Sequence, residues 1–143
     1  MGKIELRFSK NSVNKAGQAL VKNNEALHDD AKDILDNWRA CHVSPLNSFQ
    51  TSLRQKLKKT DPDALVSQRL KRTPSIIAKL KRYPGMSLSR MQDIGGIRAV
   101  VSNMQEVREL EQYYKKGTRV FSIIKGGKDY INYPKDSGYR SIH

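Results

Sequence analysis

Apolar residues recur every three or four positions through the first 60 residues, which is the spacing of helices that bury one face. Three sets follow this rule: Val13, Ala16 and Leu20; Leu27, Ala31, Ile34, Leu35 and Trp38; and Leu46, Phe49, Leu53 and Leu57. Ser9 or Ser12 can cap the first helix, and Ser44 followed by Pro45 is a cap-and-first-turn pair for the third. Residues 1–60 are therefore expected to form a helical region.

The pattern changes after residue 60, where short apolar runs alternate with amphipathic stretches. Strands are predicted at 65–70, 97–101 and 120–124, and helices from Thr73-Pro74 to Pro84-Gly85 and from a cap formed by Asn103 and Glu106. The β-branched run at 97–101 is typical of a buried strand. This order predicts an α+β or α/β sheet domain over residues 61–143, behind the helical region 1–60. Ser141–His143 resembles the beginning of another strand, so the chain is expected to be part of a longer protein.

Composition narrows the class of protein. Hydrophobic residues make up 37% and charged residues 29% of the 143 residues, which is typical of a soluble globular chain. The single cysteine, Cys41, excludes an internal disulfide framework, and the three scattered histidines lack zinc-ligand spacing. No apolar run approaches the ~20 residues of a membrane span, and the N-terminus lacks the apolar core of a signal peptide. We expect a cytoplasmic protein without a membrane partner.

The charge points to an anionic partner. Lys and Arg number 27 against 14 Asp and Glu, a net charge of +13, which favours nucleic acid or phosphorylated small molecules. No acidic residue occurs between Ala64 and Gln92, a stretch that holds the basic residues Arg69, Lys71, Arg72, Lys79, Lys81, Arg82 and Arg90. Solvated helix faces usually mix the two signs, so this run indicates a site for several phosphates.

The first candidate site lies within that run. Ser75 falls in the first turn of the predicted helix, where free backbone N–H groups attract anions, and Lys79 and Arg82 follow on the same face. In the preceding strand, alternation brings Arg69 and Lys71 to one side. These five residues can converge on a polyphosphate; a solvated basic helix is the alternative.

The second candidate is Asp93, a carboxylate in a long basic neighbourhood. A carboxylate beside a phosphate site repels the substrate unless a divalent cation lies between them, and Mg²⁺ uses one or two carboxylates plus substrate oxygens. A helix cap or an ion pair with Arg90 explains Asp93 equally well on spacing alone.

The third candidate covers residues 128–143, where Gly138 permits a tight turn and Tyr139 lies beside cations. An aromatic ring in this setting can stack on a nucleobase while the cations bind phosphates. The pattern is common in surface loops and is weak by itself.

Together the three candidates resemble the RelA/SpoT family of (p)ppGpp synthetases. The motifs are R-x-K-x-x-x-S-x-x-x-K-x-x-R over 69–82, D-I-x-G-I-R over 93–98 and K-D-Y-I-x-x-P-K-x-S-G-Y-R-S-I-H over 128–143. The resemblance covers about residues 61–143 and implies an α+β fold, with a nucleotidyltransferase-like mixed sheet flanked by helices. It also implies a GTP pyrophosphokinase that transfers pyrophosphate from ATP to the 3′-hydroxyl of GDP or GTP. The helical residues 1–60 are similar to the extension of the family's small synthetases.

The resemblance also implies residue roles. ATP would be bound by Arg69, Lys71, Ser75, Lys79, Arg82 and Arg98, with Arg69 and Arg98 clamping the adenine. Asp93 would bind Mg²⁺, and the acceptor would be held by Lys135, Tyr139 and His143, with Tyr139 stacked on guanine. The catalytic set would be Lys79, Arg82, Asp93 and His143. Lys128 and Tyr130 match the motif without a firm role.

One departure limits the expected activity. The family's second acidic motif, E-I-Q-I-R-T, is missing, since no Glu follows Glu111. The 143 residues are therefore expected to bind ATP without turning it over. Two alternatives remain: pyrophosphate transfer to the 3′ end of tRNA, and a catalytically silent RNA-binding module. The sequence does not indicate an oligomeric state.

Overall fold

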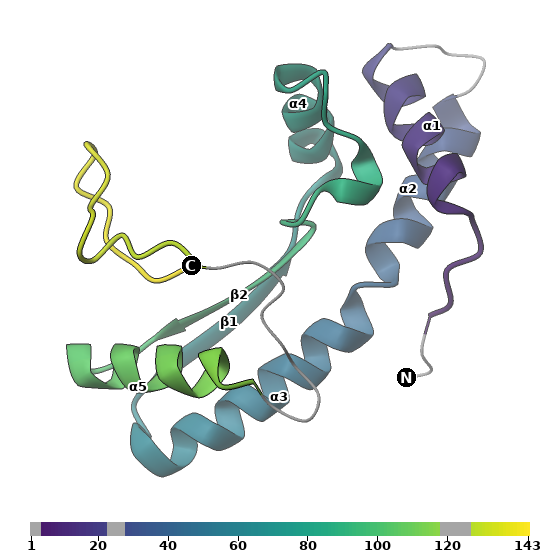
Figure 1. The fold of residues 1–143 in the computed structure, drawn as a ribbon. Helices are drawn as coiled ribbons and strands as arrows, with labels where there is room; N and C mark the ends of the chain where they lie inside the picture. Colours follow the sequence, from purple (N-terminus) through teal and green to yellow (C-terminus); the bar gives the residue numbers. More distant parts are fainter. Residues whose placement is uncertain (1–3, 23–27, 118–126) are drawn as a thin grey trace. The chain divides into compact units, whose positions relative to one another are not determined.

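The computed structural model describes residues 4–22, 28–117 and 127–143 and has an α+β fold (Figure 1). Its elements are α1 (Lys10–Val21), α2 (His28–Ala40), α3 (Val43–Thr60), β1 (Leu65–Leu70), α4 (Thr73–Arg82), the short 3₁₀ helix η2 (Leu88–Arg90), β2 (Gly95–Val100) and α5 (Met104–Lys115). The α+β class is confirmed, whereas the nucleotidyltransferase-like mixed sheet stays a prediction. The strand predicted at 120–124 lies outside the described residues.

The chain divides into two compact units, each held together by contacts among its own residues. The first contains Met1–Arg54 and Val66–Arg98, and the second contains Gln55–Leu65 and Ala99–His143. Each unit combines two separate stretches of the chain, whereas the sequence predicts one boundary at residue 60. That boundary stays a prediction. Within the described residues, no helix is both long and apolar enough to cross a membrane.

The core of the first unit joins the N-terminal helices to α4 and η2. Its buried apolar side chains are Val13, Ala16, Leu20, Ala31, Leu35, Ile76, Leu80, Leu88, Met91 and Ile94. Ser9 caps α1, since its hydroxyl accepts from the Ser12 N–H at 3.1 Å. The apolar spacing that predicts the first two helices therefore describes their buried faces, and the same core holds α4 by its Ile76 and Leu80 face.

The helix α3 begins at Val43, so the prediction that Ser44 caps it is wrong. The Leu46 N–H donates to the His42 carbonyl at 3.1 Å, and the Ser48 hydroxyl donates to the Ser44 carbonyl at 3.1 Å. Only two residues connect α2 to α3, and the chain enters the helix before it reaches Ser44. Pro45 is tolerated because first-turn N–H groups have no partner within the helix.

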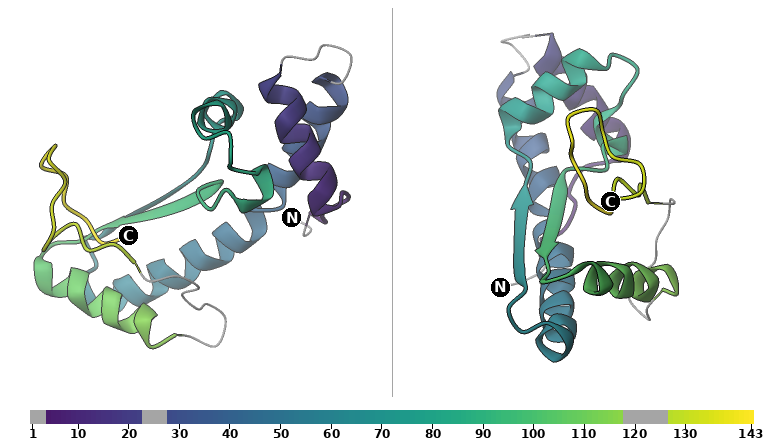
Figure 2. Two further views of the ribbon diagram at one scale, coloured as in Figure 1. Left: turned by 45° about the horizontal axis from the view of Figure 1, so that its top comes forward. Right: turned by 90° about the vertical axis from the view of Figure 1, so that its left-hand side faces the viewer.

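The strands β1 and β2 pair as a two-stranded antiparallel sheet (Figure 2). The bond from the Lys71 N–H to the Ile94 carbonyl, 2.7 Å, continues this pairing beyond the strands. The prediction of a buried strand is wrong for β2, because its residues alternate between half-buried and exposed. The half-buried face packs on α3: a Cβ added at Gly95 would lie 2.7 Å from Leu46 Cδ1, and Gln68 donates to Asn47 at 2.7 Å.

The second unit is held by polar contacts at its element ends. Asn103 caps α5, as predicted, by accepting from the Glu106 N–H at 3.0 Å. Asp61 is buried and accepts from both the N–H and the hydroxyl of Ser102, each at 2.7 Å. These two contacts fix the chain at the start of α5.

Residues 127–143 form a loop that doubles back on itself, called loop 127–143 below. Lys128 and His143 exchange two backbone hydrogen bonds of 2.8 and 2.9 Å. Next to them, Asp129 and Ile142 form a single antiparallel bridge where the sequence predicts the beginning of a strand. Gly138 has φ +78° and its N–H donates to the Lys135 carbonyl at 2.8 Å, so it makes the tight turn that the sequence predicts.

Candidate functional site

In the first unit, Asp93 lies between two lysines. Its Oδ1 accepts from Lys79 Nζ at 2.7 Å and its Oδ2 accepts from Lys71 Nζ at 3.0 Å. The Asp93 side chain is 48% exposed, so the group lies at the surface and is open to a ligand. The structure thus pairs Asp93 with two of the predicted phosphate-binding residues and assigns it neither a helix cap nor the ion pair with Arg90.

The backbone explains how residues distant in sequence meet here. Antiparallel pairing places the end of β1 beside the start of β2, so Lys71 lies next to Ile94 and close to Asp93. The Lys71 carbonyl accepts from Arg39 Nε at 3.0 Å, which ties this turn to α2. Lys79 reaches the same carboxylate from the second turn of α4. Three separate elements therefore hold the two lysines and Asp93.

The electrostatics of Asp93 favour its charged form. Partial burial by itself raises the pKa of the carboxyl, but the hydrogen bonds from Lys79 and Lys71, and their positive charges, lower it below the ordinary value of 3.8. Among the described residues, no group of three or more His, Cys, Asp or Glu side chains could hold a metal ion. A lone ionised carboxylate fits the mode in which Mg²⁺ takes its remaining ligands from substrate phosphates and water.

Ser75 and Arg82 lie on the exposed side of α4. The positions of Ser75, Lys79 and Arg82 differ by four and three residues, so they follow one face of the helix. Arg72 precedes α4 without a side-chain hydrogen bond to the first turn, which leaves N–H groups there available to an anion. Lys71 and Lys79 therefore meet at Asp93. Ser75 and Arg82 lie on the same face of α4 as Lys79.

Arg69 and Arg98 share the exposed face of the sheet. The backbone bond from the Lys71 N–H to the Ile94 carbonyl sets the antiparallel register, which places Arg69 opposite Gly96 and Arg98 opposite Ser67. The two arginines are therefore diagonal neighbours on one face. A Cβ built at Gly96 meets no atom within 4 Å, so the face of the sheet is open at this position.

Lys135, Tyr139 and His143 meet in loop 127–143 of the second unit. The Tyr139 hydroxyl lies 2.9 Å from His143 Nε2, and Lys135 Nζ lies 5.3 Å from the centre of the Tyr139 ring. Tyr130 completes the group, because Lys135 Nζ lies 4.7 Å from its ring centre and the His143 ring lies edge-on at 5.3 Å. Tyr139 is 36% exposed and is not a core residue. The three predicted acceptor residues therefore form one aromatic and cationic cluster.

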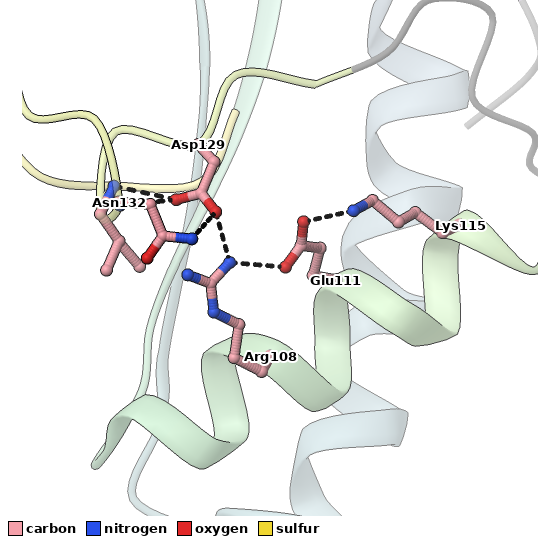
Figure 3. A network of polar contacts seen from close by, with 6 residues as sticks. Arg108, Glu111, Lys115, Asp129 and Asn132 are labelled. Carbon is pink, nitrogen blue, oxygen red and sulfur yellow. Dashed lines mark hydrogen bonds and ion pairs between the residues drawn. The ribbon is translucent and has the colours of Figure 1, made fainter.

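Two further arginines near these groups were not predicted from the sequence. Arg39 contacts the Lys71 carbonyl across 32 residues, and Arg108 bonds Asp129 across 21 residues (Figure 3). Neither separation follows a helix or strand period, and neither residue belongs to a motif. Their contacts depend on tertiary structure, so no local signal could have identified them.

Comparison with known proteins identifies the family. A family described as "Region found in RelA / SpoT proteins" matches residues 68–143. The protein named "GTP pyrophosphokinase rsh" of Brucella ovis is 33% identical over 120 residues, which are 82% of this chain and 15% of the relative. "Probable GTP diphosphokinase RSH3, chloroplastic" of Arabidopsis thaliana is 31% identical over 120 residues, which are 81% of this chain and 16% of the relative.

The extent of these matches adds two facts. The chain spans about 15% of the length of these curated relatives. The matched 82% of the chain is more than residues 61–143 comprise, so the similarity continues into the helical N-terminal region, beyond the motifs. More than half of the chain, including the two lysines, Asp93 and loop 127–143, lies in the matched region, and the chain belongs to the RelA/SpoT family.

Proposed function

We propose that this chain carries nucleotide-binding residues of an ATP:GTP/GDP 3′-pyrophosphotransferase that makes (p)ppGpp. The observation that carries the proposal is the joint approach of Lys71 and Lys79 to Asp93, beside a helix N-terminus in a RelA/SpoT region. Two cations and one carboxylate at one point suit a polyphosphate bound with a divalent cation. A nucleotidyltransferase-like fold and a cytoplasmic location are part of the proposal.

The donor site binds ATP in two parts. Arg69 and Arg98 hold the adenine ring between planar guanidinium groups over the open sheet at Gly96. Lys71, Lys79 and Arg82 bind phosphate oxygens as charges, and the Ser75 hydroxyl donates to one of them. Asp93 holds Mg²⁺, which supplies Lewis-acid polarisation of the phosphates when bound.

The acceptor site holds GDP or GTP through loop 127–143. Tyr139 stacks on the guanine, and Lys135 and His143 bind phosphates. The 3′-hydroxyl oxygen attacks the β-phosphorus of ATP, the bond from that phosphorus to the α–β bridging oxygen breaks, and AMP leaves. Lys79 and Arg82 offset the negative charge that develops on the phosphates in the transition state. The proton of the attacking hydroxyl passes to water.

Transfer of label from ATP tests the function. The complete protein is incubated with Mg²⁺ and [γ-³²P]ATP, together with GDP, GTP or tRNA. We expect labelled guanine nucleotide with stoichiometric AMP, and loss of the product in Lys79→Ala. Lys81→Ala is the matched control, because Lys81 is an exposed lysine of the same helix whose position lies off the face of Ser75 and Lys79.

The other acceptors are outcomes of the same assay. Label on tRNA, with none on GDP or GTP, would replace the proposed function with pyrophosphate transfer to the tRNA 3′ end. If no acceptor is labelled and the protein still binds RNA, the chain is a catalytically silent RNA-binding module. The 143 residues alone are expected to bind ATP without turnover, since Asp93 is their one proposed metal ligand.

A further inference from the structure

Loop 127–143 holds the acceptor residues with little regular secondary structure. Its described backbone bonds are the bridge at Asp129 with the bonds beside it and those of the turns at Tyr133 and Gly138. Most of its residues are exposed, so apolar packing contributes little to its shape. Stacking platforms need rings held in a defined orientation, because an unordered ring pays the ordering entropy on binding. Some other contact must fix this loop.

Asp129 is the polar centre of the loop. Its Oδ1 accepts from the N–H groups of Ile131 and Asn132, each at 3.0 Å, and its Oδ2 accepts from Asn132 Nδ2 at 3.0 Å. The turn that leads from Tyr130 to Asn132 therefore closes on one carboxylate. These bonds are local and shape the turn, but they do not anchor it to another element.

Arg108 of α5 supplies the anchor (Figure 3). Its Nη1 donates to Asp129 Oδ2 at 2.7 Å and to Glu111 Oε2 at 2.9 Å. The Glu111 side chain is only 9% exposed, and its other oxygen accepts from Lys115 Nζ at 2.6 Å. Arg108 thus joins a carboxylate fixed on the helix to the carboxylate that closes the turn.

The ionisation of the network agrees with this role. The hydrogen bond from Arg108, followed by the backbone bond from Asn132, lowers the pKa of Asp129 below its ordinary value. The bonds to Asp129 and Glu111 raise the pKa of Arg108. The hydrogen bonds from Lys115 and Arg108 lower the pKa of Glu111 as well. Asp129, Arg108 and Glu111 are therefore all charged at neutral pH.

We propose that Arg108 is a positioning residue for guanine-nucleotide binding: by tying Asp129 to α5 it fixes the turn that begins at Tyr130, and the Tyr130 ring in turn contacts Lys135 and Tyr139. The residue acts through Asp129 and needs no contact with the nucleotide. This inference rests on the proposed function for the identity of the ligand, whereas the ordering of the loop stands by itself. The side chain belongs to none of the three motifs.

Matched variants of the whole chain test the proposal. Arg108→Met keeps a long side chain of high helix propensity and removes both charged bonds. Lys115→Met is the control, because it removes a lysine–Glu111 ion pair from the same helix and leaves Arg108 with Asp129. Arg108→Lys retains the charge without the planar fork and should recover part of the effect.

Two measurements separate loop order from ligand binding. Amide hydrogen exchange at Ile131 and Asn132 should become faster in Arg108→Met and not in Lys115→Met. Titration calorimetry should show GDP binding weakened roughly tenfold in Arg108→Met, while ATP–Mg²⁺ binding stays within twofold of the parent. Arg108→Lys should fall between the parent and Arg108→Met in both measurements, and it serves alone if Arg108→Met does not fold.

The results test the positioning role of Arg108 and the proposed acceptor separately. Unchanged exchange at Ile131 and Asn132 overturns the positioning role, and so does faster exchange with unchanged GDP affinity. An equal loss of ATP affinity also overturns it, because the effect would then be general. If the parent binds neither GDP nor GTP, the proposed acceptor is wrong, and the exchange data alone decide whether Arg108 orders the loop.

Discussion

The ammonium group of Lys79 lies 2.7 Å from Oδ1 of Asp93, and this carboxylate accepts from Lys71 through its other oxygen at 3.0 Å. The proposed metal ligand and two proposed phosphate ligands therefore neutralise one another in the protein without nucleotide. Metal and polyphosphate must exchange with these ion pairs when they bind. The ion pairs hold both lysines in place. They also lower the affinity for phosphate, because each lysine must leave Asp93 to bind it.

This exchange predicts opposite effects of Asp93→Asn on two measurements. Pyrophosphate transfer by the complete protein should be lost because the proposed metal ligand is removed. Binding of tripolyphosphate in the presence of EDTA should instead tighten by roughly 2- to 30-fold, because two exposed ion pairs no longer compete for Lys71 and Lys79. Both can be measured by product assay and calorimetry.

The melting temperature is the control for this variant. Asp93 is 48% exposed, so its loss should shift the melting temperature by a few degrees at most. Weaker binding of metal-free tripolyphosphate in Asp93→Asn would contradict the exchange. Near-normal transfer would remove Asp93 from the metal site.

Gly95 and Gly96 are adjacent in β2 and should respond differently to alanine. A Cβ at Gly95 would lie 2.7 Å from Leu46 Cδ1, whereas a Cβ at Gly96 meets nothing within 4 Å. Gly95→Ala should therefore lower the free energy of unfolding by up to about 1 kcal/mol, because the terminal methyl group of the half-buried Leu46 must shift to make room. Gly96→Ala should leave the stability nearly unchanged, and urea unfolding of the two variants compares them directly.

Gly96→Ala also tests the proposed ATP site. Gly96 lies opposite Arg69 on the exposed face, so a methyl group there should weaken ATP binding although stability is kept. Calorimetry with ATP–Mg²⁺ measures this. If Gly96→Ala binds ATP as the parent does, the adenine ring does not lie over this part of the sheet.

Local signals predicted the element boundaries well where a cap or a proline determined them. Ser9 and Asn103 cap their helices, and Thr73-Pro74 begins α4, because each depends on bonds within a few residues. Ser44 failed as a cap because the short connection from α2 starts the helix earlier. The β-branched run of β2 predicted a strand correctly but not its exposure, which depends on what packs against each face.

The sequence predicted which residues belong to the candidate site but not which of them contact one another. Spacing grouped Ser75, Lys79 and Arg82, and the motif grouped Lys135, Tyr139 and His143. The pairing of Asp93 with both lysines was missed because it requires the antiparallel register of β1 and β2, which the sequence does not display. Contacts of this kind become visible only when the fold is known.

Acid should destabilise the protein through four carboxyl groups whose pKa values are lowered: Asp61, Asp93, Glu111 and Asp129. A carboxyl group with a lowered folded-state pKa stabilises the fold above its unfolded pKa. That stability is lost as the pH falls through the folded value. The ordinary values are 3.8 for Asp and 4.5 for Glu, so the melting temperature should fall steadily below about pH 5.

Asp61 allows the contribution of one of these four groups to be measured. The side-chain bond from Ser102 is the largest cause of its lowered pKa. Asp61→Asn should lower the melting temperature at pH 7 and reduce its slope between pH 5 and 3, and Ser102→Ala should act in the same direction more weakly. An unchanged slope in both variants would show that Asp61 does not contribute to acid unfolding.

Tyr139 distinguishes the acceptor from the donor. Stacking on a base is worth ~1–3 kcal/mol, so Tyr139→Ala in the complete protein should raise the acceptor KM by roughly 5- to 150-fold. Tyr139→Phe keeps the ring and loses only the contact of 2.9 Å with His143 Nε2, so it should retain most of the acceptor affinity. ATP affinity should not change in either variant, because the proposed donor residues lie in the other compact unit.

Tyr133 provides the matched control for this prediction. It is a tyrosine of the same loop, 79% exposed, and Tyr133→Ala should leave the acceptor KM as it is. Because Tyr139 is itself 36% exposed, its truncation should change the melting temperature little. A drop of several degrees with an unchanged acceptor KM would make Tyr139 a packing residue. An equal loss of ATP and acceptor affinity would mean that loop 127–143 serves both substrates, and the assignment of the two sites to separate parts of the chain would be wrong.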